Sequence, residues 1–289
     1  MDGRVNHVPK SFRYKINLHD DCSGPHNDRC YFLHGKVSRL FEMVNDGSGL
    51  FDLYTSDNFM KVFENKSDRL KIGLFVEPRS LHGHMYQSVE NNLDAWFGPD
   101  GFDYIYTHEE RLLKLHPKFL FLLGNGVQIK VPRLYKKSKL CSMISSNKTI
   151  TPGHIDRLKY VEKFKNDVDF YGNGFNYIPL KEKGLVEYMF SIAIENYQTD
   201  CWITEKVLDC FATGTIPVYG GPRKISNFFN PNGIIFLDDK FDVKDLNEEL
   251  YYSKMGAIKE NLERVREIEM PVDFMFNRFV EEYKWVTDL

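Results

Sequence analysis

The sequence has little of what marks a secreted, membrane-spanning or nucleic-acid-binding protein. Cysteine is sparse, with five residues in 289, which favours reduced thiols over a disulfide framework. No apolar run approaches the ~20 residues that cross a bilayer, and the opening MDGRVNHVPK lacks the apolar segment of a signal peptide. The formal net charge is only −3, without a block of like charge, which argues against binding of nucleic acid through a basic surface. We therefore expect a cytoplasmic protein with no transmembrane segment and no nucleic-acid partner.

The composition is that of a folded protein with alternating strands and helices. Hydrophobic residues make up 42% and aromatic residues 15% of the chain, which is enough for a sizeable core. Short β-rich runs alternate with stretches of helical periodicity. Strands are expected at residues 12–18, 49–55, 70–76, 102–107, 119–124, 140–146, 168–172, 188–194, 215–221 and 233–237. Helices are expected over residues 33–44, around 155–164, from Thr204, and through most of the tail after Asp242.

This alternation favours an α/β fold in which parallel sheets carry helices on both faces. Because the pattern recurs in both halves of the chain, we expect two such units, residues 1–136 and residues 137–289. The polar and basic segment YKKSK, residues 135–139, is the expected linker between them.

The stretch ENYQTDCWITEK, residues 195–206, lies between an apolar strand and a helical pattern. Thr204 is the expected N-cap of that helix and Gly214 its expected C-cap. Glu205 and Lys206 then fall in the first turn, where unpaired backbone N–H groups and the helix dipole favour an anion. A lysine there adds a mobile positive charge for phosphate. Ordinary helix capping with a solvated Lys206 is the alternative that these residues leave open.

The longer run FSIAIENYQTDCWITEKVLDCFATGTIPVYGG, residues 190–221, is more specific than any of its parts. It resembles the C-terminal signature of the α1,3-fucosyltransferases of glycosyltransferase family 10. The residues at the fixed spacings of that signature are Phe190, Glu195, Asn196, Thr204, Glu205, Lys206, Gly214, Pro217 and Gly221.

The resemblance continues upstream in shorter pieces. SSNKTITPGHIDRLKYVEKF, residues 145–164, is similar to a family segment with a Ser-Asn pair and a phosphate-binding arginine, which fall on Asn147 and Arg157. VDFYGNG, which starts at Val168, matches the element that follows. KIGLFVEPRS, residues 71–80, resembles the strand end that carries the family's proposed catalytic base, which places that base at Glu77.

The resemblance implies a GT-B architecture, in which two Rossmann-like domains face each other across a cleft. Residues 1–136 would bind the acceptor and residues 137–289 the nucleotide-sugar donor, with the last helix able to cross back to the first domain. It also implies GDP-fucose as donor, an oligosaccharide or glycolipid as acceptor, an α1,3-type linkage, and inversion at the transferred carbon. No metal or other cofactor is expected, because enzymes of this fold usually compensate the leaving diphosphate with cationic side chains and helix N-termini.

The resemblance also suggests roles for the donor residues. Asn147 and Arg157 would both bind the donor, with Arg157 gripping phosphate oxygens bidentately, and Lys206 would act as a point charge. Glu205 would accept hydrogen bonds from a ribose or fucose hydroxyl. Asn196 would orient the same region, and Trp202 would pack on the sugar or the nucleotide.

On the acceptor side, Glu77 would deprotonate the acceptor hydroxyl as general base. The segment RSLHGHMYQ, residues 79–87, carries His82 and His84 just after this base. These histidines are candidates for acceptor binding, and a simple exposed loop is the alternative.

Some features leave other interpretations open. Trp202 replaces the family's usual tyrosine and Tyr197 a small residue, so another GDP-sugar remains an alternative donor. A catalytically inactive sugar-binding module is a second alternative. DVD, residues 167–169, resembles the metal motif of GT-A transferases, but Asp169 is expected in a buried strand. A zinc site would need the residues Cys22, His26, Cys30 and His34, whose spacing fits no common zinc module and is interrupted by Gly24 and Pro25.

Overall fold

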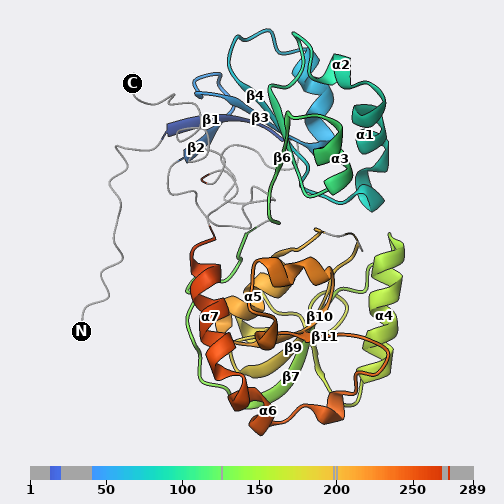
Figure 1. Ribbon diagram of the computed structural model, residues 1–289, viewed down its shortest axis with the longest axis vertical. Coiled ribbons are helices and arrows are strands. Elements are labelled where there is room, and N and C mark those ends of the chain that lie inside the picture. The colour runs from blue at the N-terminus through green and yellow to red at the C-terminus, as the bar shows by residue number, and fades with distance from the viewer. Residues whose placement is uncertain are drawn as a thin grey trace, which may run out of the picture.

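The protein contains two parallel β-sheets, one from each half of the chain (Figure 1). The computed structural model describes residues 14–20, 41–124, 126–197, 199, 201–268 and 273. The first sheet has the strand order β2-β1-β3-β4-β5-β6, and all its pairs are parallel. Its strands are β1 (Tyr14–His19), β2 (Phe41–Val44), β3 (Asp52–Thr55), β4 (Lys71–Leu74), β5 (Tyr104–Thr107) and β6 (Phe119–Phe121).

The second sheet has the order β11-β10-β9-β7-β8 and is also parallel throughout. From β7 the chain first adds β8 at one edge of the sheet. It then adds β9, β10 and β11 in turn on the other side of β7. The change of direction therefore lies between β7 and β9, the place where open α/β sheets bind ligands. The strands are β7 (Lys139–Ile144), β8 (Asp169–Tyr171), β9 (Tyr188–Ile194), β10 (Ile216–Gly220) and β11 (Ile235–Phe236).

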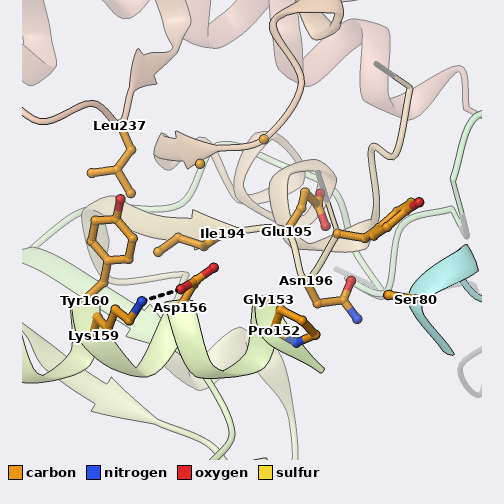
Figure 2. A pocket seen from close by; sticks show the side chains of 13 residues that line it. Ser80, Pro152, Gly153, Asp156, Lys159, Tyr160, Ile194, Glu195, Asn196 and Leu237 are labelled. Carbon is orange, nitrogen blue, oxygen red and sulfur yellow. Dashed lines mark hydrogen bonds and ion pairs between the residues drawn. The ribbon is translucent and has the colours of Figure 1, made fainter. Parts of the chain in front are cut away.

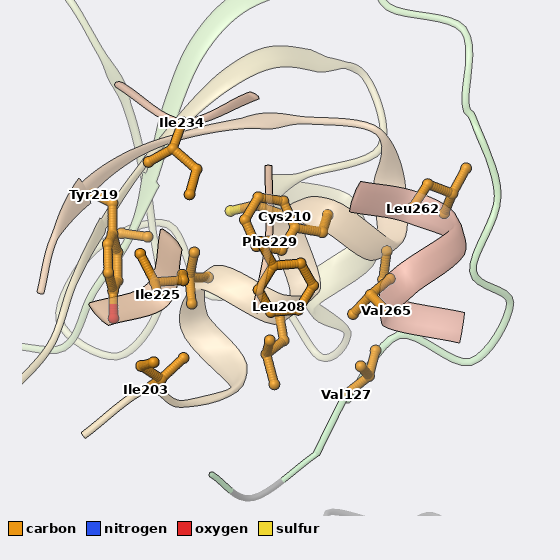
Figure 3. Packing of buried hydrophobic residues seen from close by; sticks show 14 of the residues in the cluster. Val127, Ile203, Leu208, Cys210, Tyr219, Ile225, Phe229, Ile234, Leu262 and Val265 are labelled. Atoms are coloured by element: carbon orange, nitrogen blue, oxygen red, sulfur yellow. The ribbon is translucent and has the colours of Figure 1, made fainter. Parts of the chain in front are cut away.

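Helices cover both faces of the second sheet. Ile192 and Ile194 of β9 belong to a buried cluster with Phe164 of α4, while Ala193 belongs to the cluster on the opposite face. That cluster includes Leu208 of α5 and Leu262 of α7 (Figure 3). This alternation follows from the period of two along a strand. The helices of this half are α4 (Pro152–Phe164), α5 (Glu205–Thr213), α6 (Glu248–Ser253) and α7 (Met255–Arg266).

In the first half, α1 (Arg79–Asn91), α2 (Leu93–Trp96) and a 3₁₀ helix (Ser56–Phe63) pack against the sheet. Their contact is a buried cluster rich in aromatic rings, which includes Tyr54, Phe59 and Tyr86. The short α3 (Glu110–Leu115) follows β5. None of the helices in the described part of the chain combines the length and hydropathy that a bilayer crossing requires.

Two sequence-based expectations about local structure are wrong. Residues 41–44, expected at the end of a helix, form β2, because Phe41 is buried against Phe51 and the segment pairs with β1. The segment 79–87 is not an exposed loop but the first part of α1. Residues 41–44 are a short run of mostly apolar residues, and so short a run does not distinguish a strand from the end of a helix.

The expectation that Asp169 lies in a buried strand is also wrong. Asp169 begins β8, but β8 is the edge strand of its sheet, so Asp169 is exposed rather than buried. Its carboxylate accepts a hydrogen bond of 2.7 Å from the Tyr188 hydroxyl. Pro217, in contrast, lies inside β10, where β11 pairs only with Val218 and Tyr219. The strand has no neighbour on that side at Pro217, so the missing N–H is tolerated.

The segment that connects the two sheets forms hydrogen bonds with residues of the second half. Gln128 and Ile129 donate their backbone N–H groups to the buried carboxylate of Asp209 in α5, at 2.6 and 3.2 Å. Lys137, within the expected polar linker, is buried and donates to the carbonyl oxygen of Thr213 and the hydroxyl of Thr215, both at 2.8 Å. The domain boundary at residue 136 stays a prediction, but the chain before it already contacts the second half.

Several expectations concern parts of the chain outside the described residues. Cys22, His26, Cys30 and His34 are among them, as is most of the tail after residue 268. The zinc alternative and a last helix that crosses back therefore stay predictions.

Candidate functional site

The site predicted from the 190–221 signature lies at the carboxyl end of β9. The buried carboxylate of Glu195 follows this strand and joins it to the start of α5. It accepts hydrogen bonds from the Thr204 backbone N–H at 2.9 Å, the Thr204 hydroxyl at 2.8 Å and the Tyr219 hydroxyl at 3.3 Å. Burial raises the pKa of Glu195. The sequence marked Glu195 as a signature position, and its role in the structure is to hold the α5 N-terminus in place.

Lys206 and Glu205 occupy the first turn of α5, as expected, and Thr204 caps it. The Lys206 ammonium lies 3.5 Å from a Glu195 oxygen and 3.4 Å from a Glu205 oxygen. Burial alone would lower the pKa of Lys206, but these two carboxylates outweigh it and raise that pKa. Lys206 is therefore a charged group held at a helix N-terminus.

Lys181 joins this arrangement without having been predicted. Its ammonium lies 3.4 Å from Glu205 and 3.2 Å from Asp209. It comes from a 3₁₀ helix that precedes β9, and its sequence neighbourhood carries no motif. Only the packing of that segment beside α5 brings it to the site.

Arg157 of α4 reaches a cavity of about 300 Å³ that is also lined by Lys181, Glu205 and Lys206. The Arg157 side chain is buried, and one of its terminal nitrogens donates to the Ser146 hydroxyl at 3.4 Å. Its Nε has no hydrogen-bond partner among the described residues. Burial lowers the pKa of Arg157, opposed by Glu195 and Glu205. A buried guanidinium with an unused donor suits an anionic ligand, because an unpaired polar group is unfavourable there.

Asn196 and Trp202 contact each other directly. The indole N–H of Trp202 donates to Oδ1 of Asn196 at 3.0 Å. The indole ring is 3% exposed and packs on His108 from the first half of the molecule, with ring centroids 4.2 Å apart. Trp202 thus fills the junction between the halves and leaves little surface for a sugar or a base. Its predicted packing on the ligand stays untested.

Asn147 lies at the rim of the site. Its backbone N–H donates to the carbonyl of Asn173 at 2.9 Å, and its side chain lies against Gly174. Asn147 is exposed, whereas Arg157 is buried. A phosphate-binding role for Asn147 remains a prediction.

Gly153 in the first turn of α4 allows the chain to approach Asn196 closely. A Cβ atom at this position would lie 2.0 Å from the Asn196 backbone oxygen. We expect Gly153→Ala to displace Asn196 and to reduce the free energy of unfolding by ~1–3 kcal/mol. Gly256→Ala is the matched control, because a Cβ there meets nothing within 4 Å. Thermal denaturation measures the loss of stability, and equal behaviour of the two variants would refute the role of Gly153.

Glu77 lies where it was expected, after the carboxyl end of β4, and is half-buried. The turn that carries it is held from two sides. The Ser56 hydroxyl accepts the backbone N–H of Val76 at 3.1 Å, and the Tyr86 hydroxyl donates to the Glu77 carbonyl at 2.9 Å. A fixed backbone is what a positioned general base requires.

His82 and His84 both belong to α1. His82 is half-buried at a kink where its backbone leaves the helical region, while His84 is exposed. Their rings lie 6.5 Å apart. The structure places them on the same helix as Ser80, but their predicted role in acceptor binding is untested.

His108 makes folding sensitive to acid. It is buried between Trp202 and Tyr86, and burial, assisted by Arg79, lowers its pKa to about 3. An unfolded histidine titrates near 6.5, so below that pH the unfolded state binds the additional proton. We expect the free energy of unfolding to fall by up to ~3 kcal/mol between pH 6.5 and pH 4. Urea titrations should detect this, and His108→Phe should remove it; an unchanged slope in that variant would contradict the assignment.

The metal alternative finds no support at DVD. Asp167 and Asp169 are both exposed. Across the described ranges, no group of three or more His, Cys, Asp or Glu side chains is placed to hold an ion.

Sequence comparisons with known proteins concern the part of the chain that contains the site, and structural comparisons concern the fold. Residues 134–257 match the family described as "Glycosyltransferase family 10 (fucosyltransferase) C-term". The chain is 32% identical over 81 residues to the α-(1,3)-fucosyltransferase FucT of Helicobacter pylori, a match that covers 28% of this chain and 16% of that protein. The chain thus aligns with only a small part of that relative.

Two crystal structures share the whole fold. An α1,3-fucosyltransferase with GDP-fucose has a TM-score of 0.52 at 14% identity, over 99% of this chain and 95% of that one. A second α1,3-fucosyltransferase structure has a TM-score of 0.51 at 14% identity, over 97% and 93% of the two chains. The expected α/β fold of GT-B type, with two parallel sheets, is confirmed. Residues 134–257, which hold Arg157, Asn196, Glu205 and Lys206, are thus similar to the C-terminal part of the glycosyltransferase family 10 fucosyltransferases.

Proposed function

We propose that the protein is an inverting, metal-independent fucosyltransferase that moves fucose from GDP-fucose to a glycan hydroxyl, with an α1,3-type linkage. The observation that carries this proposal is the buried Arg157, whose Nε has no partner among the described residues, in one cavity with Lys206. The family match over residues 134–257 supports the class of reaction. The acceptor would be an oligosaccharide or a glycolipid.

The cavity suits a diphosphate leaving group. Transfer breaks the bond between the sugar carbon and the diphosphate oxygen, so negative charge grows on the diphosphate. Arg157 and Lys206 supply two positive charges, and the α5 N-terminus adds oriented N–H groups. Glu205, which lines the same cavity, is suited to accept a hydrogen bond from a ribose or fucose hydroxyl.

The other half of the reaction needs a base for the acceptor hydroxyl. In a single displacement, that oxygen attacks the sugar carbon from the face opposite the leaving GDP, so the configuration inverts. The hydroxyl proton passes to the Glu77 carboxylate. The bonds from Ser56 and Tyr86 that hold the Glu77 turn support this role.

The larger ring of Trp202, in place of the family's usual tyrosine, was one reason to consider a different donor sugar. The position of Trp202 weakens that reason. This ring packs on His108 and not into the cavity that contains Arg157. The additional bulk therefore does not reduce the space beside the diphosphate site, and fucose remains the proposed sugar.

Thermal-shift measurements with GDP, UDP, CDP and dTDP, and with GDP-fucose, would test the donor class with EDTA present. We expect stabilisation by the GDP compounds, of ~2.7 kcal/mol when the ligand is at a hundred times its Kd. Stabilisation by a UDP-sugar that EDTA abolishes would overturn the proposal. Slow release of fucose from GDP-fucose without an acceptor would then separate an enzyme from an inactive sugar-binding module.

A further inference from the structure

A second cavity, of about 730 Å³, lies at the carboxyl ends of β9 and β10 (Figure 2). Its walls come from the N-terminal half of α4 and from Leu237 after β11, and Ser80 of α1 closes it from the first half of the molecule. The volume lies within the range of ~300–1,000 Å³ typical of small-molecule sites. Ile194 lines both this cavity and the one that contains Arg157.

The charges in this second cavity compensate each other. Asp156 and Lys159 form an ion pair of 2.6 Å. The Glu195 carboxylate is turned away and accepts the hydrogen bonds of Thr204. The first cavity contains the Arg157 guanidinium with an unused donor, which suits a diphosphate. The described charged residues that line this second cavity are all paired. Its ligand is therefore expected to be neutral.

The remaining lining groups suit a carbohydrate. The rings of Tyr160 and Tyr197 offer flat apolar faces, and Leu237 adds an aliphatic wall. Figure 2 shows the Tyr160 ring rising from α4 toward Leu237. The amide of Asn196 and the hydroxyl of Ser80 can exchange hydrogen bonds with sugar hydroxyls. A mostly apolar pocket with a few polar groups is the usual form of such a site.

The position of the cavity connects it to the reaction. Ser80 stands three residues after Glu77, on the helix that begins just after it. Asn196, from the second half, follows β9, and its side-chain oxygen accepts the hydrogen bond of the Trp202 indole N–H. A ligand in this cavity thus lies between the turn that carries the base and the end of β9, next to the proposed donor site.

We propose that this cavity binds neutral sugar rings of the acceptor, and that Tyr160 of the C-terminal half selects them. This inference rests on the proposed function, which supplies the reaction that consumes such an acceptor. It assigns part of acceptor selection to the C-terminal half, where the sequence suggested only donor binding. It also predicts a preference for neutral over acidic oligosaccharides.

Ligand-observed NMR with GDP-saturated protein provides the test. The probes are the neutral disaccharides lactose and N,N′-diacetylchitobiose and the acidic 3′-sialyllactose, each at millimolar concentration. We expect the neutral probes to bind better than the acidic one. Tyr160→Ala removes one ring face and should weaken neutral-sugar binding about tenfold. Leu237→Trp fills the cavity and should weaken it at least as much, whereas Glu162→Ala, on the exposed side of the same helix, should bind as the wild type does.

Thermal shift with GDP is measured on every variant, to separate this inference from the proposed function. A normal GDP shift with lost sugar binding supports the inference. Loss of the GDP shift in Tyr160→Ala would assign the cavity to the donor instead. Stronger binding of 3′-sialyllactose, no binding of either neutral probe to the wild type, or full neutral-sugar binding by Leu237→Trp would each overturn the inference. If GDP fails to shift the wild type, the proposed function fails, and neutral-sugar binding without GDP still decides whether the cavity is a sugar site.

Discussion

Glu77→Gln is expected to lower the rate of sugar transfer by ~10²–10⁴, the usual contribution of a general base. The amide has the shape of the carboxylate but cannot take the acceptor proton. The described contacts that hold this turn are made by backbone atoms of Val76 and Glu77, so they survive the change. The Kd for GDP should stay the same, because none of the residues around the Arg157 cavity is altered. Steady-state kinetics on the true acceptor, together with calorimetry of GDP binding, measures the two effects.

Glu64→Gln is the matched control for this variant, since Glu64 is an exposed carboxylate of the same half. It should leave the rate of transfer unchanged. Near-normal turnover by Glu77→Gln would show that another group takes the proton. Glu109 is a poor substitute, because its buried carboxylate already binds the Arg79 guanidinium, with contacts of 2.6 to 3.1 Å.

Arg157→Met is expected to lower turnover and GDP binding without lowering the stability of the protein. Loss of one positioned donor to the leaving diphosphate should lower turnover by ~10²–10³, by analogy with other stabilising donors of developing charge. The thermal shift caused by GDP should largely disappear. Without ligand, however, the variant should be as stable as the wild type or more stable, because the buried guanidinium has an unused Nε and a lowered pKa.

Arg133→Met is the control for Arg157→Met. Its guanidinium is exposed and stacks on the Tyr135 ring, with 4.4 Å between the guanidinium carbon and the ring centroid. This variant should keep both the activity and the GDP shift. If Arg157→Met instead loses several kcal/mol of stability and still responds fully to GDP, Arg157 is structural and the donor assignment is wrong.

The parts of the fold that could be predicted depend on local signals. The N-cap at Thr204 and the left-handed C-cap at Gly214 bound α5 as expected, because capping is decided within one turn of the helix. Strand β9 covers the expected residues 188–194, because all its residues except Ser191 are hydrophobic and it is buried on both faces. The prediction for residues 41–44 was wrong because so short an apolar run fits a helix end or a strand, and its pairing partner β1 lies more than twenty residues earlier.

The sequence by itself determined the class of fold and the residues of the signature, since both follow from short-range patterns of apolar, capping and charged residues. Only the tertiary structure decided what those side chains contact. In the folded protein Glu195 contacts Thr204 and Lys206. Lys181 lies beside Glu205, and Trp202 packs on His108. Lys181 and Glu205 are 24 residues apart, and Trp202 and His108 belong to different halves of the chain. The geometry of these contacts depends on how sheets and helices pack, and no local pattern of residues encodes it.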